Sequence, residues 1–326
     1  MIKLNSVHYP IVEDINISKE YSLDILKNNE SYLETEKKFL QKYSFPSLKT
    51  FSFNKDGFLA LLFELQKKGK VAISLGETNA LVEAGKYYES LGFEISWIHL
   101  QKDGQVNFEE LKNIDGGFLF LSSYVMDTFV KTDLQKVKNI TSTTLISNAT
   151  VEYSKYSDAV YFDPYKLVGF NFSGVVLSDS IFEKQSIGYL DNVSVCKIFD
   201  ALEKQKFTLG FKEKFKKNLE EKFSEDIYFF VDSNATLDFT LHFGLKNLKA
   251  RYLIRTLSLD EILITNGEGC SLGLSQPSRI IQEMGYSQDM SRNSISLSFS
   301  QEINDENIEK VCSIMYKRYR QIKVLK

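Results

Sequence analysis

The residue whose type and setting best suit covalent chemistry is a cysteine. Cys270 lies in "TNGEGCSLGLSQPSRIIQEMG" (265–285), among glycines and serines, and a short apolar helix pattern follows Pro277. A thiolate on a loop of small residues can act as a nucleophile or accept sulfur as a persulfide. The same setting also suits a partly buried thiol in a turn, which performs no chemistry. The segment therefore has two interpretations.

The other cysteines and the histidines form no local motif. The three cysteines are an odd number without CxxC spacing, which indicates neither a disulfide framework nor a zinc site; they are Cys196, Cys270 and Cys312. The three histidines, at positions 8, 99 and 242, lie far apart and have no neighbours that suggest a dyad or a metal motif. No metal site is expected.

Elements that would position such a loop can be predicted from hydrophobic patterning. Short apolar runs alternate with helical patterns such as "NALVEAGKYYESLG" (79–92), and a segment that opens on Asn107 as an N-cap. The predicted strands are "KVAISL" (70–75), "FEISWIHL" (93–100), "GFLFLSS" (117–123), "TTLISNA" (143–149), "DAVYFD" (158–163) and "SGVVLSD" (173–179). Apolar strands between helices favour an α/β fold with a mostly parallel central sheet covered by helices on both faces.

The pattern changes after about residue 196. Two helical segments, "CKIFDALEKQKF" and "FKEKFKKNLEEKF", precede the predicted strands 237–244, 261–265 and 294–300 and a helix over 247–258, and a long helix closes the chain at 304–322. The alternating signs of the second helical segment favour a solvated amphipathic face over a basic patch. We predict a large domain over 12–206 and a smaller C-terminal α/β domain over 207–326.

Composition excludes several classes of partner. Lys and Arg total 40 against 43 Asp and Glu, so a formal net charge of -3 provides no field that would attract nucleic acid. No run of about 18 apolar residues and no basic, apolar leader occurs, so we expect no membrane partner and a cytoplasmic location.

Three segments together resemble the cysteine desulfurase branch of the class V aminotransferases. The stretch from Gly267 to Ser298 matches that family's cysteine loop, the helix after it and its Ser-Ile-Arg-Phe-Ser strand without a gap. "GETNALVEAGKYYESLGFEISW" and "DAVYFDPYKLVGFNFSGVVLSD" resemble two further family segments. These enzymes depend on pyridoxal 5'-phosphate (PLP) and have fold type I, so the resemblance implies that fold and that cofactor.

The resemblance assigns two covalent residues. Lys166 matches the lysine that forms a Schiff base with PLP, and Cys270 matches the cysteine that accepts the substrate sulfur. Both are the catalytic residues that the resemblance implies.

Around the PLP ring, the family's contact residues are replaced. Its aspartate beneath the ring nitrogen corresponds to Asn148, whose amide cannot supply a charge. The nearby glutamine corresponds to Val151, the stacking histidine to Thr78 and the asparagine at the ring hydroxyl to Met126.

The phosphate and substrate contacts are replaced as well. The threonine that starts the first helix falls in "SFNKDGF", at Asn54 and Asp56. A serine and a histidine near the lysine correspond to Asp163 and Tyr165, and carboxylates would repel a phosphate dianion. We expect Asp56 and Asp163 to serve instead as helix-cap or turn residues. The arginine that binds the substrate carboxylate corresponds to Ser296, which cannot make a bidentate ion pair.

These observations leave three function hypotheses. The first is a divergent PLP-dependent C–S lyase or sulfurtransferase of the cysteine desulfurase type that acts on an amino acid. The second is an inactive paralogue that has lost PLP and acts as a partner or regulatory subunit in sulfur metabolism. The third is a binder of a different small molecule in the vacated cleft. The resemblance implies a homodimer.

Overall fold

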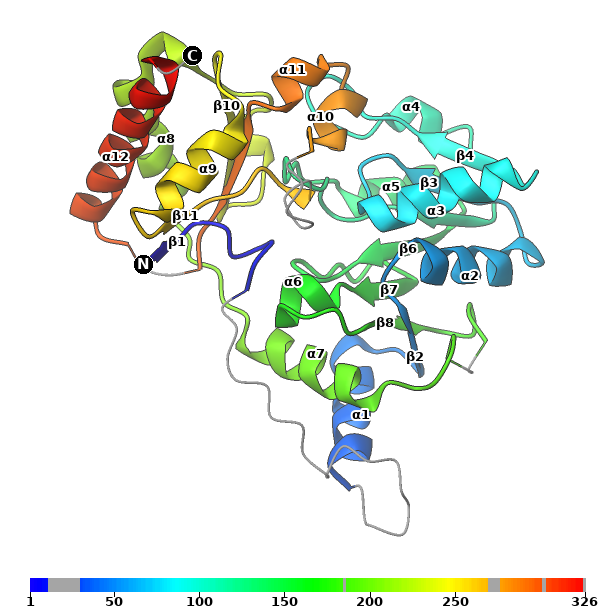
Figure 1. The fold of residues 1–326 in the computed structure, drawn as a ribbon. Helices are drawn as coiled ribbons and strands as arrows, with labels where there is room; N and C mark the ends of the chain where they lie inside the picture. Colours follow the sequence, from blue (N-terminus) through cyan, green and yellow to red (C-terminus); the bar gives the residue numbers. More distant parts are fainter. Residues whose placement is uncertain (11–29, 184–185, 269–275, 301–302, 325–326) are drawn as a thin grey trace.

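The computed structural model describes residues 1–326 apart from 11–29, 184–185, 269–275, 301–302 and 325–326. Two units lie side by side, the larger on the right and the smaller on the left of Figure 1. Each unit contains a sheet with its own buried cluster of apolar side chains.

The larger unit is built on a seven-stranded sheet with the order β2-β8-β7-β6-β5-β3-β4. β8 pairs antiparallel with β2 and with β7, and the other four pairs are parallel, so the prediction of a mostly parallel sheet is confirmed. The strands are β2 (Ser47–Ser52), β3 (Val71–Ser74), β4 (Ile95–Ile98), β5 (Phe118–Phe120), β6 (Thr144–Asn148), β7 (Ala159–Phe162) and β8 (Ser173–Ser178).

Helices cover both faces of this sheet, as alternate side chains along the strands point to opposite sides. Phe118 and Phe120 pack in the cluster of α2 (Lys55–Gln66) and α3 (Asn79–Ser90), whereas Leu119 packs in that of α4 (Phe108–Leu111) and α5 (Leu134–Ile140). Further along the second face, Val160 and Phe162 contact α1 (Glu30–Tyr43) and α7 (Asn192–Lys204). The predicted α/β fold class is confirmed.

The smaller unit has a three-stranded antiparallel sheet, β12-β10-β9, and a separate parallel pair, β1 and β11. Helices α8, α9 and α12 pack their apolar faces on it. The bounds are β1 (Ile2–Lys3), β9 (Ile227–Tyr228), β10 (Thr240–Leu245), β11 (Ile262–Leu263), β12 (Ser294–Ser298), α8 (Lys212–Phe223), η3 (Ser224–Asp226), η4 (Ser233–Ala235), α9 (Ala250–Ser258), α10 (Arg279–Glu283), α11 (Gln288–Ser291) and α12 (Asp305–Val324).

The start of the chain belongs to the smaller unit, which the sequence pattern did not predict. β1 pairs in parallel with β11, and Asn5 forms a bridge with Ser298 of β12. The predicted domain boundary at 206 and 207 falls between the end of α7 and the start of α8 and remains a prediction.

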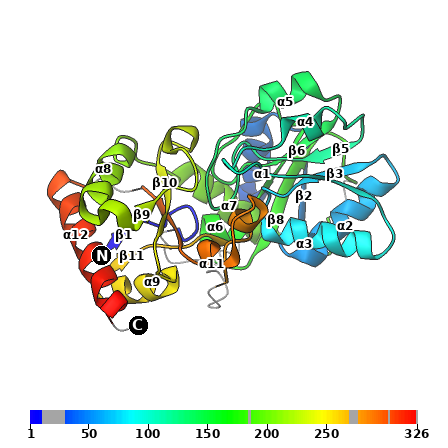
Figure 2. The same ribbon diagram turned by 90° about the horizontal axis from the view of Figure 1, so that it is seen from above.

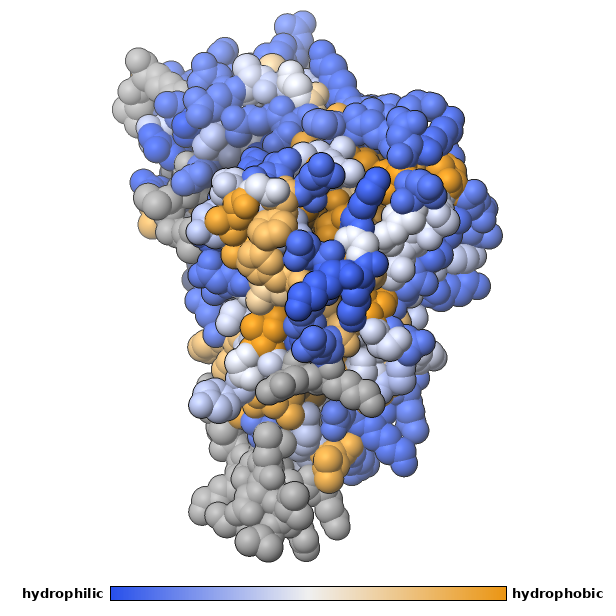
Figure 3. Space-filling view, turned by 90° about the vertical axis from the view of Figure 1, so that its right-hand side faces the viewer, coloured by the Kyte–Doolittle hydropathy of each residue, from blue (hydrophilic) through white to orange (hydrophobic). Residues whose placement is uncertain are grey.

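Seen from above, the short helices α6 (Pro164–Val168) and α11 lie where the two units meet (Figure 2). On the face over α2 and α3, apolar side chains gather among hydrophilic ones (Figure 3); Phe63 and Leu91 are among those that stay exposed. Among the described helices, none combines the length and the apolar character that crossing a membrane requires.

Candidate functional site

The candidate site lies at the carboxyl ends of the parallel strands, where open α/β sheets place ligands. The segment after β3 supplies Thr78, and the segment after β5 supplies Met126 and Asp127. Asn148 ends β6, and the turn after β7 leads into α6 with Lys166. Residues far apart in the sequence therefore meet where the smaller unit packs against this edge.

Lys166 is held in place by the local structure of α6. Asp163 is the N-cap of this helix, where its Oδ1 accepts hydrogen bonds from the backbone N–H groups of Tyr165 and Lys166 at 2.9 and 3.2 Å. Gly169 ends the helix with a left-handed backbone, φ +79°. The predicted cap role of Asp163 is confirmed, and the Lys166 side chain, 7% exposed, points into the protein.

The Lys166 ammonium contacts a carboxylate from the smaller unit. Its Nζ lies 2.8 Å from Glu268 Oε1, 3.6 Å from the sulfur of Met126 and 3.8 Å from Asp163 Oδ2. The Glu268 side chain is 15% exposed, so this ion pair is largely buried. Glu268 stands two residues before Cys270, in the loop that the sequence singled out.

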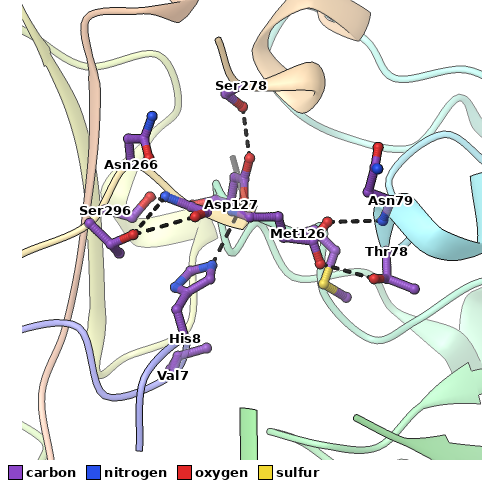
Figure 4. A network of polar contacts seen from close by, with 12 residues as sticks. Val7, His8, Thr78, Asn79, Met126, Asp127, Asn266, Ser278 and Ser296 are labelled. Carbon is purple, nitrogen blue, oxygen red and sulfur yellow. Dashed lines mark hydrogen bonds and ion pairs between the residues drawn. The ribbon is translucent and has the colours of Figure 1, made fainter. Parts of the chain in front are cut away.

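The Glu268 carboxylate is also bound by the start of α3. Oε1 accepts a hydrogen bond from Thr78 Oγ1 at 3.0 Å, and Oε2 accepts one from the backbone N–H of Asn79 at 2.9 Å (Figure 4). Thr78 is the N-cap of this helix, but its own side chain does not cap the helix. Glu268 therefore fills the capping role and places negative charge at the positive end of the helix.

These contacts favour charged forms of both partners. Burial alone would lower the pKa of Lys166, but the carboxylates of Glu268 and Asp163 raise it above its usual range. Burial would raise the pKa of Glu268, but the ammonium of Lys166 lowers it below its usual range. Each partner therefore stabilises the charged form of the other.

A second buried carboxylate, Asp127, holds the loop of Glu268 against the rest of the protein. Its Oδ1 accepts from the backbone N–H of Glu268 at 2.8 Å, and its Oδ2 accepts from Ser278 Oγ at 2.8 Å (Figure 4). His8 Nε2 lies 3.8 Å from Oδ1. Burial would raise the pKa of Asp127, but the His8 imidazole and these donors lower it.

Ser296, which aligns with the family's substrate arginine, takes part in this cluster. Its Oγ donates to the backbone carbonyl of Asp127 at 2.9 Å, and the side chain is fully buried (Figure 4). His242 lies opposite Ser296 on β10. The place predicted for a substrate carboxylate therefore lies beside a buried anionic side chain, which disfavours a further negative charge.

Gly267 allows the loop to approach Asp127. Its φ is +95°, and an added Cβ would lie 2.1 Å from Asp127 Oδ1. We expect Gly267→Ala to lose about 2 kcal/mol more of the free energy of unfolding than Gly285→Ala, since clash adds to backbone strain. Gly285 is a matched control, because it has a φ of +85° and an added Cβ would meet nothing within 4 Å. Urea unfolding of both variants checks this, and equal losses would contradict the close approach.

A further buried carboxylate, Glu77, lies behind the site. Ser122 Oγ and Tyr161 OH each donate to it at 2.5 Å, and burial raises its pKa. Asn148, the replacement for the family's ring-nitrogen aspartate, accepts from the backbone N–H of Thr150 at 2.9 Å. Its Nδ2 is buried and has no hydrogen-bond partner among the described residues.

Tested against these contacts, the residues do not fit PLP. A Schiff base forms from the neutral amine, and the carboxylate of Glu268 raises the pKa of Lys166 and so disfavours that form. Asn148 offers an amide where the cofactor nitrogen needs a carboxylate, and Asp163 places a carboxylate in the predicted phosphate region. The phosphate dianion would therefore meet repulsion in a site with little exposure to water.

The other predicted residues lie elsewhere. Asn54 is the N-cap of α2, whereas Asp56 is an exposed residue of its first turn, so the cap role expected of Asp56 falls to Asn54. Tyr165 packs edge-on against Tyr9, and Val151 packs against the cluster that contains Met126. Cys270 lies outside the described residues.

Sequence reasoning missed three residues of the site: Glu268, Asp127 and His8. Two of them could have been found from their neighbours in the sequence, because Glu268 stands two positions before Cys270 and Asp127 follows Met126 directly. No neighbour in the sequence pointed to His8, since it reaches Asp127 only through the pairing of β1 in the smaller unit.

Comparisons with known proteins show similarity in structure but not in sequence. No family model and no curated protein matches the chain. A NifS-like protein superposes with a TM-score of 0.78 and 14% identity, covering 98% of this chain and 99% of that one. A NifS-like protein from Rickettsia africae ESF-5 superposes with a TM-score of 0.72 and 15% identity, covering 98% of this chain and 99% of that one. DndA from Streptomyces lividans superposes with a TM-score of 0.63 and 13% identity, covering 84% of this chain and 89% of that one. The protein thus has the fold of NifS-like proteins, as its resemblance to cysteine desulfurases predicted.

Proposed function

We propose that this protein is an inactive relative of the cysteine desulfurases that does not form a Schiff base with PLP and acts as a partner or regulatory subunit. The observation that carries the proposal is the Glu268 carboxylate, 2.8 Å from Lys166 Nζ. The Glu268 carboxylate stabilises the ammonium form of the amine that would have to react with an aldehyde, and this form must lose a proton before it can act as a nucleophile.

Two features of the surroundings support this proposal. Burying a cofactor phosphate beside Asp163 would add a dianion to a region that already contains a buried carboxylate. At the position that aligns with the family's substrate arginine, Ser296 donates to the Asp127 backbone and offers a substrate carboxylate no ion pair. A carboxylate without an ion-pair partner is costly to bury.

Incubation with excess PLP tests the proposal. We expect the purified protein to stay colourless after gel filtration, and borohydride treatment to leave the mass of the peptide containing Lys166 unchanged. Lys166→Ala serves as the control and should give the same spectrum as the wild type. A yellow wild-type protein whose colour disappears in Lys166→Ala would contradict the proposal.

One observation favours a second candidate, a divergent PLP-dependent C–S lyase. Lys166 lies close to Met126, and both Lys166 and Thr78 contact the Glu268 carboxylate. The resemblance assigns the positions of Lys166, Met126 and Thr78 to the cofactor site. The same PLP titration decides between the two candidates.

Three further expectations accompany the proposal: a homodimer, a cytoplasmic location and a role in sulfur metabolism. Exposed apolar side chains on α2 and at the end of α3, among them Phe63 and Leu91, support a surface that another chain covers (Figure 3). SspA, a structural neighbour with 12% identity and a TM-score of 0.68, has been solved in complex with cysteine.

A further inference from the structure

The donors around Glu268 form a complete receptor for one carboxylate group. They comprise a buried ammonium, a hydroxyl and a backbone N–H, contributed by Lys166, Thr78 and Asn79. The N–H belongs to the first turn of a 12-residue helix, whose dipole adds to the attraction. Each donor lies within 3.0 Å of a carboxylate oxygen, so the geometry already suits a carboxylate ligand.

A further donor beside the receptor is unused. The hydroxyl of Tyr124 is buried and has no hydrogen-bond partner among the described residues. Burial raises the pKa of this hydroxyl, and the charges of Lys166 and Glu268 also influence it. A buried hydroxyl without a partner is costly, so a ligand that supplied an acceptor here would gain a hydrogen bond.

One of these donors, Lys166, also lies in the wall of a cavity of about 410 Å³. The described wall residues include four lysines and one carboxylate, Asp200. Leu167, Val168 and Phe207 provide apolar surface on the same wall. Such a cavity suits the apolar body of an organic anion and disfavours an ammonium group.

We propose that this site binds a small organic monocarboxylate, whose carboxylate takes the place of Glu268 on Lys166, Thr78 and Asn79 while its apolar body occupies the adjoining cavity. This inference rests on the proposed function, because it requires that Lys166 is not attached to PLP. Exchange of one carboxylate for another leaves the buried charge unchanged. A phosphate dianion would add charge close to Asp163 and is therefore excluded from the ligand class.

Glu268 acts in this scheme as an internal competitor, so removing its carboxylate should strengthen ligand binding. We expect Glu268→Ala to bind hexanoate at least about tenfold more tightly than the wild type in calorimetric titrations. Hexanoate should also raise the melting temperature of this variant, since it returns a counterion to Lys166. Hexanamide, which has the same body without the charge, should do neither.

Two controls separate specific binding from general effects. In Glu268→Ala with Lys166→Met, hexanoate should neither bind nor stabilise, because the ammonium is absent. Inorganic phosphate should not replace hexanoate in Glu268→Ala. The inference would be overturned if hexanoate and hexanamide had equal effects. It would also be overturned if hexanoate still stabilised the double variant, or if phosphate stabilised Glu268→Ala as much as hexanoate does.

The experiment remains decisive if Glu268→Ala does not fold. Glu268→Gln keeps the size of the side chain but removes its charge, and the same titrations apply to it. Wild-type protein that turns yellow with PLP would overturn the proposed function, whereas colourless protein whose variants ignore hexanoate would overturn the carboxylate site alone.

Discussion

Replacing Glu268 with alanine is expected to lower the free energy of unfolding by about 3 kcal/mol, because it leaves the Lys166 ammonium buried without its nearest counterion. Lys166 is 7% exposed, and Asp163, the other carboxylate near its Nζ, is 3.8 Å away. The substitution also removes the acceptor for Thr78 Oγ1 and for the Asn79 N–H. Urea unfolding at neutral pH measures the loss.

A double-mutant cycle with Lys166→Met separates the ion pair from the helix contacts. The double variant should be more stable than Glu268→Ala alone, since it no longer contains an unpaired buried cation. Glu261→Ala is a matched control, because Glu261 pairs with the chain's N-terminal amine but is 77% exposed. Glu261→Ala should lower the free energy of unfolding by less than about 1 kcal/mol. Losses of similar size at positions 261 and 268 would contradict a buried ion pair.

Replacing His242 with leucine is expected to remove about 3 kcal/mol of acid-induced destabilisation. Burial lowers the pKa of His242 from 6.5 to about 4, so protonation favours the unfolded chain. Its contribution to stability is fully present above pH 6.5 and is lost as the pH falls from 6.5 towards about 4. The wild type should therefore lose stability across this window, and the variant should lose less.

The side chain of His242 makes the substitution a clean test. Both ring nitrogens are buried and have no hydrogen-bond partner among the described residues, so leucine breaks no bond there. His99→Gln is the control for the loss of a surface histidine, because His99 is 58% exposed. The pKa values of Asp127 and Glu268 are lowered in the folded protein. Their contributions to stability are therefore lost only at lower pH, as the pH falls through those values. Chemical unfolding at several pH values between 7 and 4 checks the prediction, and parallel profiles for wild type and His242→Leu would contradict it.

Local pattern was sufficient for the fold of the larger unit. Apolar runs such as Val71–Ser74 and Ala159–Phe162 are buried strands, and Asn107 and Asp163 cap helices through their own side chains. These features depend on residues close together in the sequence, so periodicity and capping chemistry predict them. The family resemblance of the segment around it singled out Lys166, which lies in α6 behind this cap.

Tertiary structure alone decided what faces Lys166. Glu268 reaches it across 102 positions of sequence, and His8 approaches Asp127 from the N-terminal segment of the smaller unit. No local pattern encodes such distances, because the contacts arise only when the two units pack and exclude water from the charges between them. The sequence by itself determined the α/β fold and the position of the lysine, and packing decided that this lysine pairs with a buried carboxylate, since that contact joins groups from both units.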